Sequence, residues 1–499
     1  MTHARIAAAI ATLLAISFAA ASPAAAEEAA KPAAAPAPGE ILLPTPSPRQ
    51  LAWQEMETIA FAHFGVNTFT NKEWGDGKED PKIFNPTEFD ARQWTKALKA
   101  GGVRMLILTA KHHDGFCLWP SAYTDHSVKS STWRDGKGDV VKEVAEACRM
   151  EGLKFGVYLS PWDRHEPKYG DSPKYNQHFI NQLYELLQNY GDVSEIWFDG
   201  ACGEGPNGKR QVYDFPAFIA VVRKCAPDAV IFSDAGPDVR WVGNENGYAG
   251  ETCWSTIDRS KVTIGKSDAK YLNKGDPNGP NWVPPECDVS IRPGWFYHPA
   301  DDEKVKSLGQ LLDIYYASVG RNGVLLLNVP PDTRGLIHEN DAARLKEFRK
   351  VLDETFRTNL ARGRSITATS AAEDHAASRA VDGNGDTWWA AANGTSDAAL
   401  TIDLGGQTLF NVAMVQEMIT QGQRVEEFRV EAWDGAGWRE IGKGTTVGHK
   451  RLLRVGDTKT NKVRLLIAKS RGEPTVREFG LYLAPPLTTS EEPKCGLDL

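Results

Sequence analysis

A carboxylate stands at the end of an apolar run near the middle of the chain. Residues 194–199 are Ser-Glu-Ile-Trp-Phe-Asp, and Gly200 follows. A strand covered on both faces is uniformly hydrophobic, so Asp199 at its last position is out of pattern and is a candidate nucleophile. Asp-Gly is also an ordinary turn signal, and this interpretation competes with the catalytic one.

Other apolar runs of the chain are also followed by polar and aromatic side chains. In a barrel of parallel strands, the loops after the strands form one rim, so these side chains should converge there. They could then act in acid–base chemistry or bind a sugar. They are His63, Asn67, Glu73, Trp74, Lys111, His112, His113, Asp114, Ser160, Trp162, Asp163, Asp234, Asp238, Arg240, Trp241, Asn244, Glu245, Trp295 and Asn328.

Several of these residues also have structural explanations. His112 and His113 could be metal ligands, but neighbouring residues on a strand point to opposite faces, so hydrogen bonding to a polyol is preferred. His63 could equally be a core histidine with its hydrogen bonds satisfied. The tryptophans could simply pack, although aromatic rings beside carboxylates suit the apolar face of a sugar.

The elements that position these residues follow an alternating pattern. Strand-like apolar runs alternate with amphipathic helices between about 55 and 355, which predicts an α/β fold of the (β/α)8 barrel type. Asp139 is the expected N-cap of one helix, and no clear helix is expected between about 255 and 300. The predicted strands are 59–69, 104–110, 154–159, 194–199, 229–233, 251–257, 288–291 and 323–329, and the predicted helices include 90–100, 139–148, 174–190, 214–225 and 303–319.

Length predicts several domains, and the N-terminal sequence predicts an exported protein. The chain has 499 residues, 41% hydrophobic and 24% charged, with a net charge of −8 that disfavours nucleic acid or an anionic membrane surface as a partner. A charged, apolar and small-residue N-terminus predicts a secretory signal peptide, periplasmic or extracellular localisation, and no membrane span in the mature protein. The seven cysteines form no CxxC pair, so no zinc site is expected and no disulfide is assigned. The predicted segments are a signal peptide 1–26, an Ala/Pro-rich leader 27–48, a barrel 49–357, a β-sandwich (jelly roll) 358–485 and a tail 486–499.

Three motifs carry a resemblance to a known family. Trp-Phe-Asp-Gly at 197–200, Lys-His-His-Asp-Gly-Phe at 111–116 and Arg-Trp-Val-Gly-Asn-Glu at 240–245 resemble family 29 glycoside hydrolases, the retaining α-L-fucosidases. The resemblance implies that Asp199 is the nucleophile and Glu245 the acid/base, with Glu251 as a competitor for the second role. It implies a fucose pocket lined by His63, Glu73, Trp74, His112, His113, Tyr158, Trp197, Arg240 and Trp295.

The Gly-Asn-Glu signature at 243–245 resembles the branch of the family specific for α-1,3/1,4 linkages. Fucosylated oligosaccharides or glycoconjugates are the implied partners. Double displacement by two carboxylates needs no metal. Two alternatives stay open at this point: a retaining glycosidase for another sugar, and a non-catalytic glycan-binding protein.

Beyond about residue 358 the pattern changes to short alternating segments. The motifs at 380–383, 387–389, 400–405 and 476–479 resemble the discoidin-like, factor 5/8 C-type module. Some such modules hold a structural calcium, and by resemblance Asp382 would be a ligand here. The module could bind glycans or only support the barrel, because a fold does not fix a function.

Overall fold

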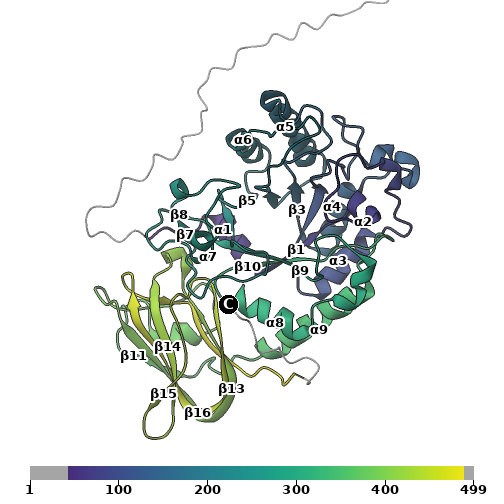
Figure 1. Cartoon of the computed structure of the whole chain (residues 1–499). Helices are drawn as coiled ribbons and strands as arrows, with labels where there is room; N and C mark the ends of the chain where they lie inside the picture. Colours follow the sequence, from purple (N-terminus) through teal and green to yellow (C-terminus); the bar gives the residue numbers. More distant parts are fainter. Residues whose placement is uncertain (1–42, 488–499) are drawn as a thin grey trace, which may run out of the picture. The chain divides into compact units, whose positions relative to one another are not determined.

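The computed structural model describes residues 43–487, in which eight parallel strands close into a barrel (Figure 1). The strand order is β1-β10-β9-β6-β5-β4-β3-β2, and every neighbouring pair is parallel. The predicted fold class is therefore confirmed. The strands are β1 (Thr58–Ala62), β2 (Met105–Lys111), β3 (Lys154–Leu159), β4 (Glu195–Trp197), β5 (Val230–Ser233), β6 (Val239–Trp241), β9 (Pro285–Ser290) and β10 (Val324–Asn328). The predicted signal peptide, leader residues 27–42 and tail residues 488–499 lie outside the described residues.

Alternation along the strands separates the barrel interior from the layer beneath the helices. On β1, Ile59 and Phe61 belong to the interior cluster, whereas Ala60 and Ala62 pack in the outer core. Because successive side chains of a strand point to opposite faces, the residue two positions beyond Phe61 also faces inward. By the same alternation, Glu195 and Trp197 of β4 face inward, and so does Asp199, two positions further on. Residues just past the strand ends are thereby aimed at the barrel axis.

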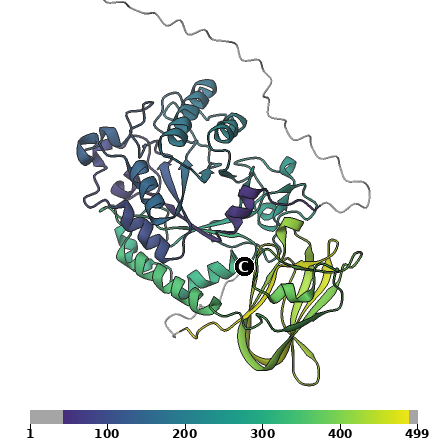
Figure 2. The ribbon, with the colours of Figure 1, turned by 180° about the vertical axis from the view of Figure 1, so that it is seen from behind.

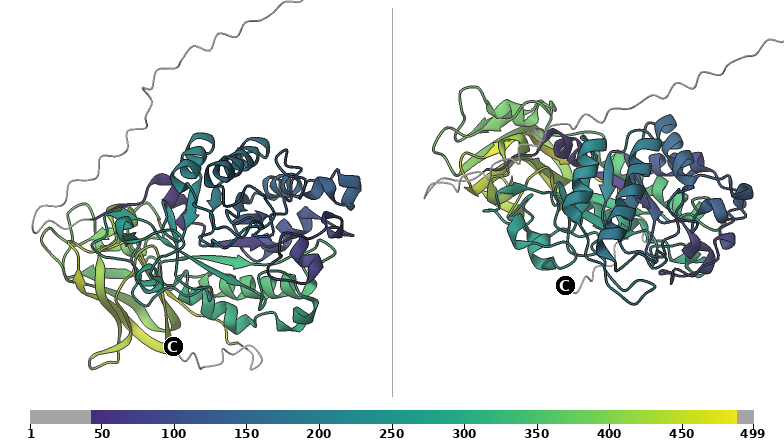
Figure 3. Two further views of the ribbon diagram at one scale, coloured as in Figure 1. Left: turned by 45° about the horizontal axis from the view of Figure 1, so that its top comes forward. Right: turned by 90° about the horizontal axis from the view of Figure 1, so that it is seen from above.

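Helices cover the outside of the ring of strands, as the views of Figures 2 and 3 show. Asp90 and Asp139 cap α3 and α4 by accepting backbone N–H groups, as expected for Asp139. The helices are α1 (Pro48–Gln54), α2 (Val66–Thr70), α3 (Ala91–Ala100), α4 (Val140–Glu151), α5 (Ser172–Asn189), α6 (Phe215–Cys225), α7 (Ala269–Lys274), α8 (Leu308–Ala317) and α9 (Glu339–Phe356).

The structure corrects three predictions about these elements. The sixth barrel strand is β6, not 251–257, of which only β7 (Thr256–Ile257) is a strand and pairs with β8 (Asn281–Trp282) outside the barrel. β6 is only three residues long and has Arg240 at its centre, so it lacks an apolar run. The predicted strand 59–69 ends at Ala62 and gives way to α2, and the short helix α7 lies in the segment expected to lack one.

The C-terminal domain consists of antiparallel strands. Its six-stranded sheet has the order β11-β13-β16-β14-β15 with β18 beside β13, and β12 pairs with β17. The long strands β13 and β16 pair through two register shifts, where β-bulges bend the ribbon. The strands are β11 (Ser365–Ala368), β12 (Trp389–Ala390), β13 (Ala398–Gln416), β14 (Val425–Trp433), β15 (Trp438–Gly444), β16 (Arg451–Ser470), β17 (Thr475–Val476) and β18 (Glu478–Tyr482). Across residues 43–487, no helix has the length and apolar character needed to cross a bilayer.

Candidate active site

Asp199 lies just beyond β4 and is held by two donors. The Tyr158 hydroxyl donates to Asp199 Oδ2 at 2.9 Å, and the backbone N–H of Ala201 donates to Oδ1 at 2.7 Å. His113 Nε2 stands 3.8 Å from Asp199 Oδ2. Both carboxylate oxygens are therefore oriented, while part of the side chain stays open to solvent. An oriented, accessible carboxylate is what a nucleophile at this position requires.

Glu245 lies on the loop after β6 and is in electrostatic reach of Asp199. Its nearest hydrogen-bond donor is Trp295, whose indole Nε1 is 3.4 Å from Glu245 Oε2. Burial raises the pKa of Glu245, and the charges of Asp199 and Glu73 raise it further, although the Trp295 hydrogen bond acts in the opposite direction. A carboxyl with a raised pKa near an oriented carboxylate matches the division of labour between a general acid and a nucleophile.

Glu73 is bonded to the loop after β9. Its carboxylate accepts from the backbone N–H groups of Trp295 at 2.8 Å and Phe296 at 3.2 Å, and His298 Nε2 lies 2.6 Å from Glu73 Oε1. His298 Nδ1 in turn lies 2.7 Å from Asn71 Oδ1. Glu73 thus fixes the segment that carries Trp295. The expectation from the resemblance was direct contact with the sugar, and the structure adds this positioning contact.

The three predicted histidines come together at the ends of β1 and β2. The rings of His63 and His112 are 5.7 Å apart, and those of His112 and His113 are 4.1 Å apart. His63 Nδ1 lies 2.8 Å from Asn328 Oδ1, and His113 Nδ1 lies 2.7 Å from the Ser160 hydroxyl. His112 and His113 occupy the same side because β2 ends at Lys111, beyond a register shift.

Burial sets the charge of these imidazoles. It lowers the pKa of His63 to about 3, lowers that of His112 well below its usual range, and lowers that of His113 despite the opposing charge of Asp199. At neutral pH the His63 and His112 rings are therefore neutral. A neutral imidazole has one donor and one acceptor nitrogen, which suits hydrogen bonding to sugar hydroxyls.

Aromatic side chains frame the carboxylates and imidazoles. Trp74 is 57% exposed and meets His113 and Trp162 edge-on, with ring centroids 5.8 and 5.7 Å away. Trp295 lies 5.2 Å from the His63 ring. Trp197 sits deeper in the barrel, stacked on Phe232 at 3.9 Å, with its indole donating to Glu286 at 2.7 Å. Trp74 and Trp295 therefore belong to the rim of the site, and Trp197 belongs to its floor.

Arg240 is the predicted pocket residue that the structure places elsewhere. By strand parity, Val239 and Trp241 face the barrel interior and Arg240 faces outward. Its side chain is fully buried, and its guanidinium donates to the carbonyls of Leu272 at 2.9 Å, Trp254 at 2.8 Å and Val283. Arg240 therefore holds the segment between β6 and β9 together, and these contacts engage its guanidinium outside the barrel interior.

Glu251, the competitor for the acid/base role, is engaged by two arginines. Its carboxylate pairs with Arg321, between α8 and β10, and with Arg451 Nη2 at 2.7 Å, on β16. It is 64% exposed. Its paired position favours Glu245 as the acid.

Three further carboxyls lie near the site: Asp234, which the sequence predicts at the rim, and Glu195 and Asp288, which the sequence analysis does not name. Burial and then the charge of Asp199 raise the pKa of Asp234 to about 6, and Gly265 N–H donates to Asp234 at 2.7 Å. Glu195 accepts from Trp53 at 2.8 Å, and Asp288 accepts from the indole of Trp241 at 2.9 Å. Strand parity is the signal that could have found them, because Glu195 and Asp288 occupy inward positions.

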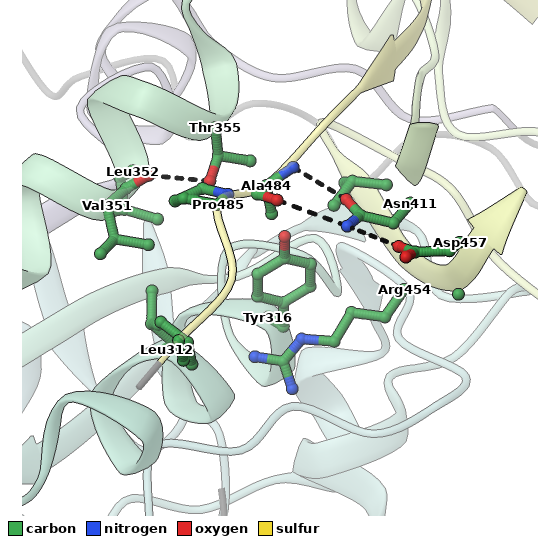
Figure 4. Close-up of a pocket in the computed structure, with 13 residues that line it drawn as sticks. Leu312, Tyr316, Val351, Leu352, Thr355, Asn411, Arg454, Asp457, Ala484 and Pro485 are labelled. Atoms are coloured by element: carbon green, nitrogen blue, oxygen red, sulfur yellow. Dashed lines mark hydrogen bonds between the residues drawn. The ribbon is translucent and has the colours of Figure 1, made fainter. Parts of the chain in front are cut away.

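A separate pocket lies away from these residues, and Figure 4 shows the side chains that line it. Its volume is about 260 Å³, and it is formed by α8, α9 and residues of the C-terminal domain. Arg454 lies over the Tyr316 ring at 4.2 Å, and Asn411 bonds to Asp457 and to the backbone of Ala484. No predicted catalytic or binding residue lines this pocket, so it is not the candidate active site.

The arrangement of fold and site defines a class of protein. A (β/α)8-type barrel carries two carboxyls of different character at the carboxyl ends of its strands, framed by imidazoles and indoles. Chemistry in such barrels takes place at this end. Paired carboxyls beside aromatic rings are the equipment of a glycoside hydrolase.

Comparisons with known proteins identify the family. The Alpha-L-fucosidase family profile matches residues 48–355, and the F5/8 type C domain profile matches residues 365–479. Alpha-L-fucosidase 1 of Arabidopsis thaliana is 47% identical over 449 residues, which cover 89% of this chain and 88% of that protein. The chain belongs to the alpha-L-fucosidase family, glycoside hydrolase family 29, and it is an alpha-L-fucosidase with a C-terminal F5/8 type C domain.

Solved structures agree with this assignment. The crystal structure of SpGH29 is 42% identical, with a TM-score of 0.86, and the match covers 90% of this chain and 100% of that one. The Ruminococcus gnavus GH29 fucosidase in complex with fucose is 35% identical, with a TM-score of 0.83, over 91% of this chain and 97% of that one. Fucosylated glycans fit this enzyme as substrates.

Proposed function

We propose that this alpha-L-fucosidase is a retaining exo-enzyme that removes terminal L-fucose by double displacement, with Asp199 as nucleophile and Glu245 as acid/base. The observation that carries the proposal is the pair itself. Asp199 is oriented by Tyr158 and Ala201, and the pKa of Glu245 is raised by burial and by the charges of Asp199 and Glu73. The two carboxyls therefore differ in their readiness to ionise, as the two roles demand.

In the first displacement, Asp199 attacks the anomeric carbon while protonated Glu245 gives its proton to the departing glycosidic oxygen. The bond from the anomeric carbon to that oxygen breaks, and fucose becomes esterified to Asp199. In the second, ionised Glu245 takes a proton from water, whose oxygen attacks the anomeric carbon and releases Asp199. Two inversions restore the original configuration at that carbon.

The proposed binding residues divide into hydrogen-bonding and stacking groups. His63, His112 and His113 present imidazole nitrogens to the hydroxyls of the sugar, and Trp74 and Trp295 present apolar surface to its ring. We infer an α-1,3/1,4 preference from the Gly-Asn-Glu signature that ends on Glu245.

Two variants and a product analysis test the catalytic roles. Asp199→Ala should abolish hydrolysis of an aryl α-L-fucoside. Glu245→Gln should lower kcat/KM by about 100- to 10,000-fold for a poor leaving group, which is the usual contribution of general acid catalysis. Asp234→Asn is the matched control, because Asp234 is another carboxyl with a raised pKa near Asp199. Survival of activity in Asp199→Ala, a larger loss in Asp234→Asn than in Glu245→Gln, or a β-configured first product would refute the assignment.

Linkage preference needs its own assay. Lewis-type trisaccharides and 2′-fucosylated lactose present the same sugar on different linkages. The proposal expects fast release from the trisaccharides, and rapid cleavage of 2′-fucosylated lactose would contradict it.

We also propose export to the periplasm or the medium, on the strength of the N-terminal sequence at 1–26. Expression in a bacterial host should yield mature protein that begins near residue 27 outside the cytoplasm, as N-terminal sequencing would show. A full-length N-terminus in the cytoplasmic fraction would contradict it.

A structural calcium in the C-terminal domain is a further proposal, and the donors present there fit one. Calcium takes oxygen ligands from carboxylates, hydroxyls and carbonyls. The Thr387 hydroxyl lies 2.7 Å from Asp382 Oδ2, and burial and then the nearby Asp382 charge raise the pKa of Glu478 to about 7. Asp382, Thr387 and Glu478 would hold the ion, which would offset the charge repulsion between the two carboxyls. Within residues 43–487 no three His, Cys, Asp or Glu side chains form a metal-binding group, so backbone carbonyls would complete the shell.

A further inference from the structure

The segment that follows the Glu245 loop is bonded to the C-terminal domain. Thr446 accepts from the backbone N–H of Cys253 at 2.9 Å, and Gln423 Oε1 accepts from the N–H of Ser255 at 2.7 Å. Gln423 Nε2 donates to the Cys253 carbonyl at 3.0 Å. Gln423 and Thr446 are buried. Three backbone groups of the barrel therefore find their partners in a different domain.

Arg451 adds a charged contact at Glu251, where the loop that carries Glu245 ends. Its Nη1 donates to the Glu251 carbonyl at 2.8 Å and its Nη2 to the Glu251 carboxylate at 2.7 Å. Arg321 pairs with the same carboxylate from the barrel side and also donates to the Ala249 carbonyl at 3.1 Å. Glu251 is thus clamped between two arginines, one from each domain.

The contacts on the domain side are themselves fixed. Buried Glu417 accepts from the N–H groups of Arg424 and Val425 at 2.7 and 2.8 Å, and from that of Gly448 at 2.6 Å. This single carboxyl ties together the loop that carries Gln423 and the loop that precedes β16. Hydrogen bonds within the C-terminal domain therefore hold the loops that carry Gln423 and Thr446.

By contrast, Glu245 has few contacts of its own. The described hydrogen bond to its carboxyl is the 3.4 Å contact with Trp295. Between β6 and Glu251, the loop is held by Asn273, which donates to the carbonyls of Val242 and Tyr248, and by the N–H of Ala249, which donates to Ala317. Within the loop, Asn244 donates to the Tyr248 carbonyl at 2.8 Å and accepts from the N–H of Asn246 at 3.1 Å. The loop around Glu245 is therefore braced as a unit, and its placement in the site depends on where the two ends of the loop are fixed.

We propose that the C-terminal domain is a positioning element for catalysis: Arg451 and Gln423 fix the end of the loop that carries Glu245, and so place the acid on the glycosidic oxygen. This inference rests on the proposed role of Glu245. It assigns the domain a task in the reaction that does not require it to bind sugar. The side chains concerned act through the loop, so they are positioning residues.

Leaving-group dependence separates this role from simple support of the fold. A 2,4-dinitrophenolate leaves without a proton, whereas an unsubstituted phenolate needs one, so a misplaced acid harms only the phenyl α-L-fucoside. The constant to compare is kcat/KM, since it reports the first displacement alone. A misplacement of about 1 Å can cost about 100-fold, so partial loosening in Arg451→Gln or Gln423→Ala should cost about 10-fold on the phenyl substrate. The dinitrophenyl substrate should change by less than about 2-fold, because its departure needs no general acid.

A matched control removes a similar ion pair inside the C-terminal domain. Arg464 donates to Glu431 at 2.6 Å between β16 and β14, and it makes no described contact with the 251–255 segment. Arg464→Gln should leave the ratio of the two kcat/KM values unchanged even if it lowers Tm. All variants are assayed well below their Tm, and Gln423→Ala keeps the Arg451–Glu251 pair should Arg451→Gln fail to fold.

The possible results are distinct. A selective loss on the phenyl substrate in both interface variants supports the proposal. Equal losses on both substrates, or no loss, overturn it, provided that Glu245→Gln shows the selective loss. If Glu245→Gln is itself not selective, the acid assignment fails, and a selective loss in the interface variants would then point to a different acid.

Discussion

Removal of Glu73 tests whether this residue positions a loop or contacts the sugar. Its carboxylate accepts backbone N–H groups of Trp295 and Phe296, and its side chain is 37% exposed. A hydrogen bond to a charged group contributes about 1.5 to 3 kcal/mol when buried, and partial exposure reduces this to about 1 kcal/mol each. Glu73→Ala therefore loses about 2 kcal/mol of loop positioning, which would lower kcat/KM about 30-fold if fully expressed in the transition state. Glu73→Gln keeps one acceptor oxygen and should lose about 1 kcal/mol, or about 5-fold.

The same variants change the pH profile in a defined direction. The Glu73 charge raises the pKa of Glu245, so removing the charge lowers that pKa. The acid must be protonated to act, and activity falls as the pH rises through its pKa. The alkaline limb of kcat/KM should therefore move to lower pH in both variants.

The assay is kcat/KM for an aryl α-L-fucoside from pH 4 to 9, with Tm measured in parallel. Glu79→Gln is the matched control. Glu79 accepts the backbone N–H groups of Asp76 and Gly77, in the loop that also contains Glu73, at 2.7 and 2.9 Å, and it does not contribute to the shift in the pKa of Glu245. A rise in KM alone, with kcat and the alkaline limb unchanged, would refute the positioning role and restore the direct sugar contact.

Three further predictions concern Arg240, His63 and the proposed calcium site. Arg240→Met leaves three carbonyls without donors, so it should destabilise the protein by about 3 kcal/mol or more while KM for an aryl fucoside stays unchanged below Tm; a raised KM at constant stability would mean that Arg240 does reach the sugar. The pKa of His63 is lowered to about 3 by burial, whereas the unfolded value is about 6.5, so its contribution to stability is complete above pH 6.5 and is lost as the pH falls toward 3. The Tm of His63→Asn should therefore fall less steeply with acid than that of the parent, and parallel curves would contradict this. Chelation of calcium should lower the Tm of the parent but not that of Asp382→Ala, and an unchanged parent Tm would remove the calcium proposal.

Much of the barrel could be predicted because its strands are continuous apolar runs. β3 was predicted with its observed bounds, and β2, β5 and β10 within two residues at each end. The sequence pattern did not predict β6, because its three residues include an arginine, and composition does not show that an arginine is buried. Its guanidinium is satisfied by three carbonyls from 254–283, which are distant in sequence and depend on the completed fold.

The candidate site was partly predictable for a related reason. Residues that continue the inward parity of a strand, such as His63 and Asp199, reach the barrel axis whatever the loops do. Glu245 and Glu73 lie on loops, both contact Trp295, and the charge of Glu73 contributes to the raised pKa of Glu245. The sequence predicts these residues as candidates, but only the structure shows which backbone groups bind the carboxylate of Glu73.

The same argument explains why Glu251 remained a competitor until the structure was known. Glu245 and Glu251 lie six positions apart on one loop, and both are carboxylates in a segment rich in glycine. The two differ in a partner 200 residues away, because Arg451 binds the carboxylate of Glu251 and does not bind that of Glu245. Burial, and then the charges of Asp199 and Glu73, raise the pKa of Glu245, which suits the proposed role of this carboxyl as the acid. The contacts that engage Glu251 and leave Glu245 as the proposed acid therefore come from outside the loop, and one of them comes from the C-terminal domain.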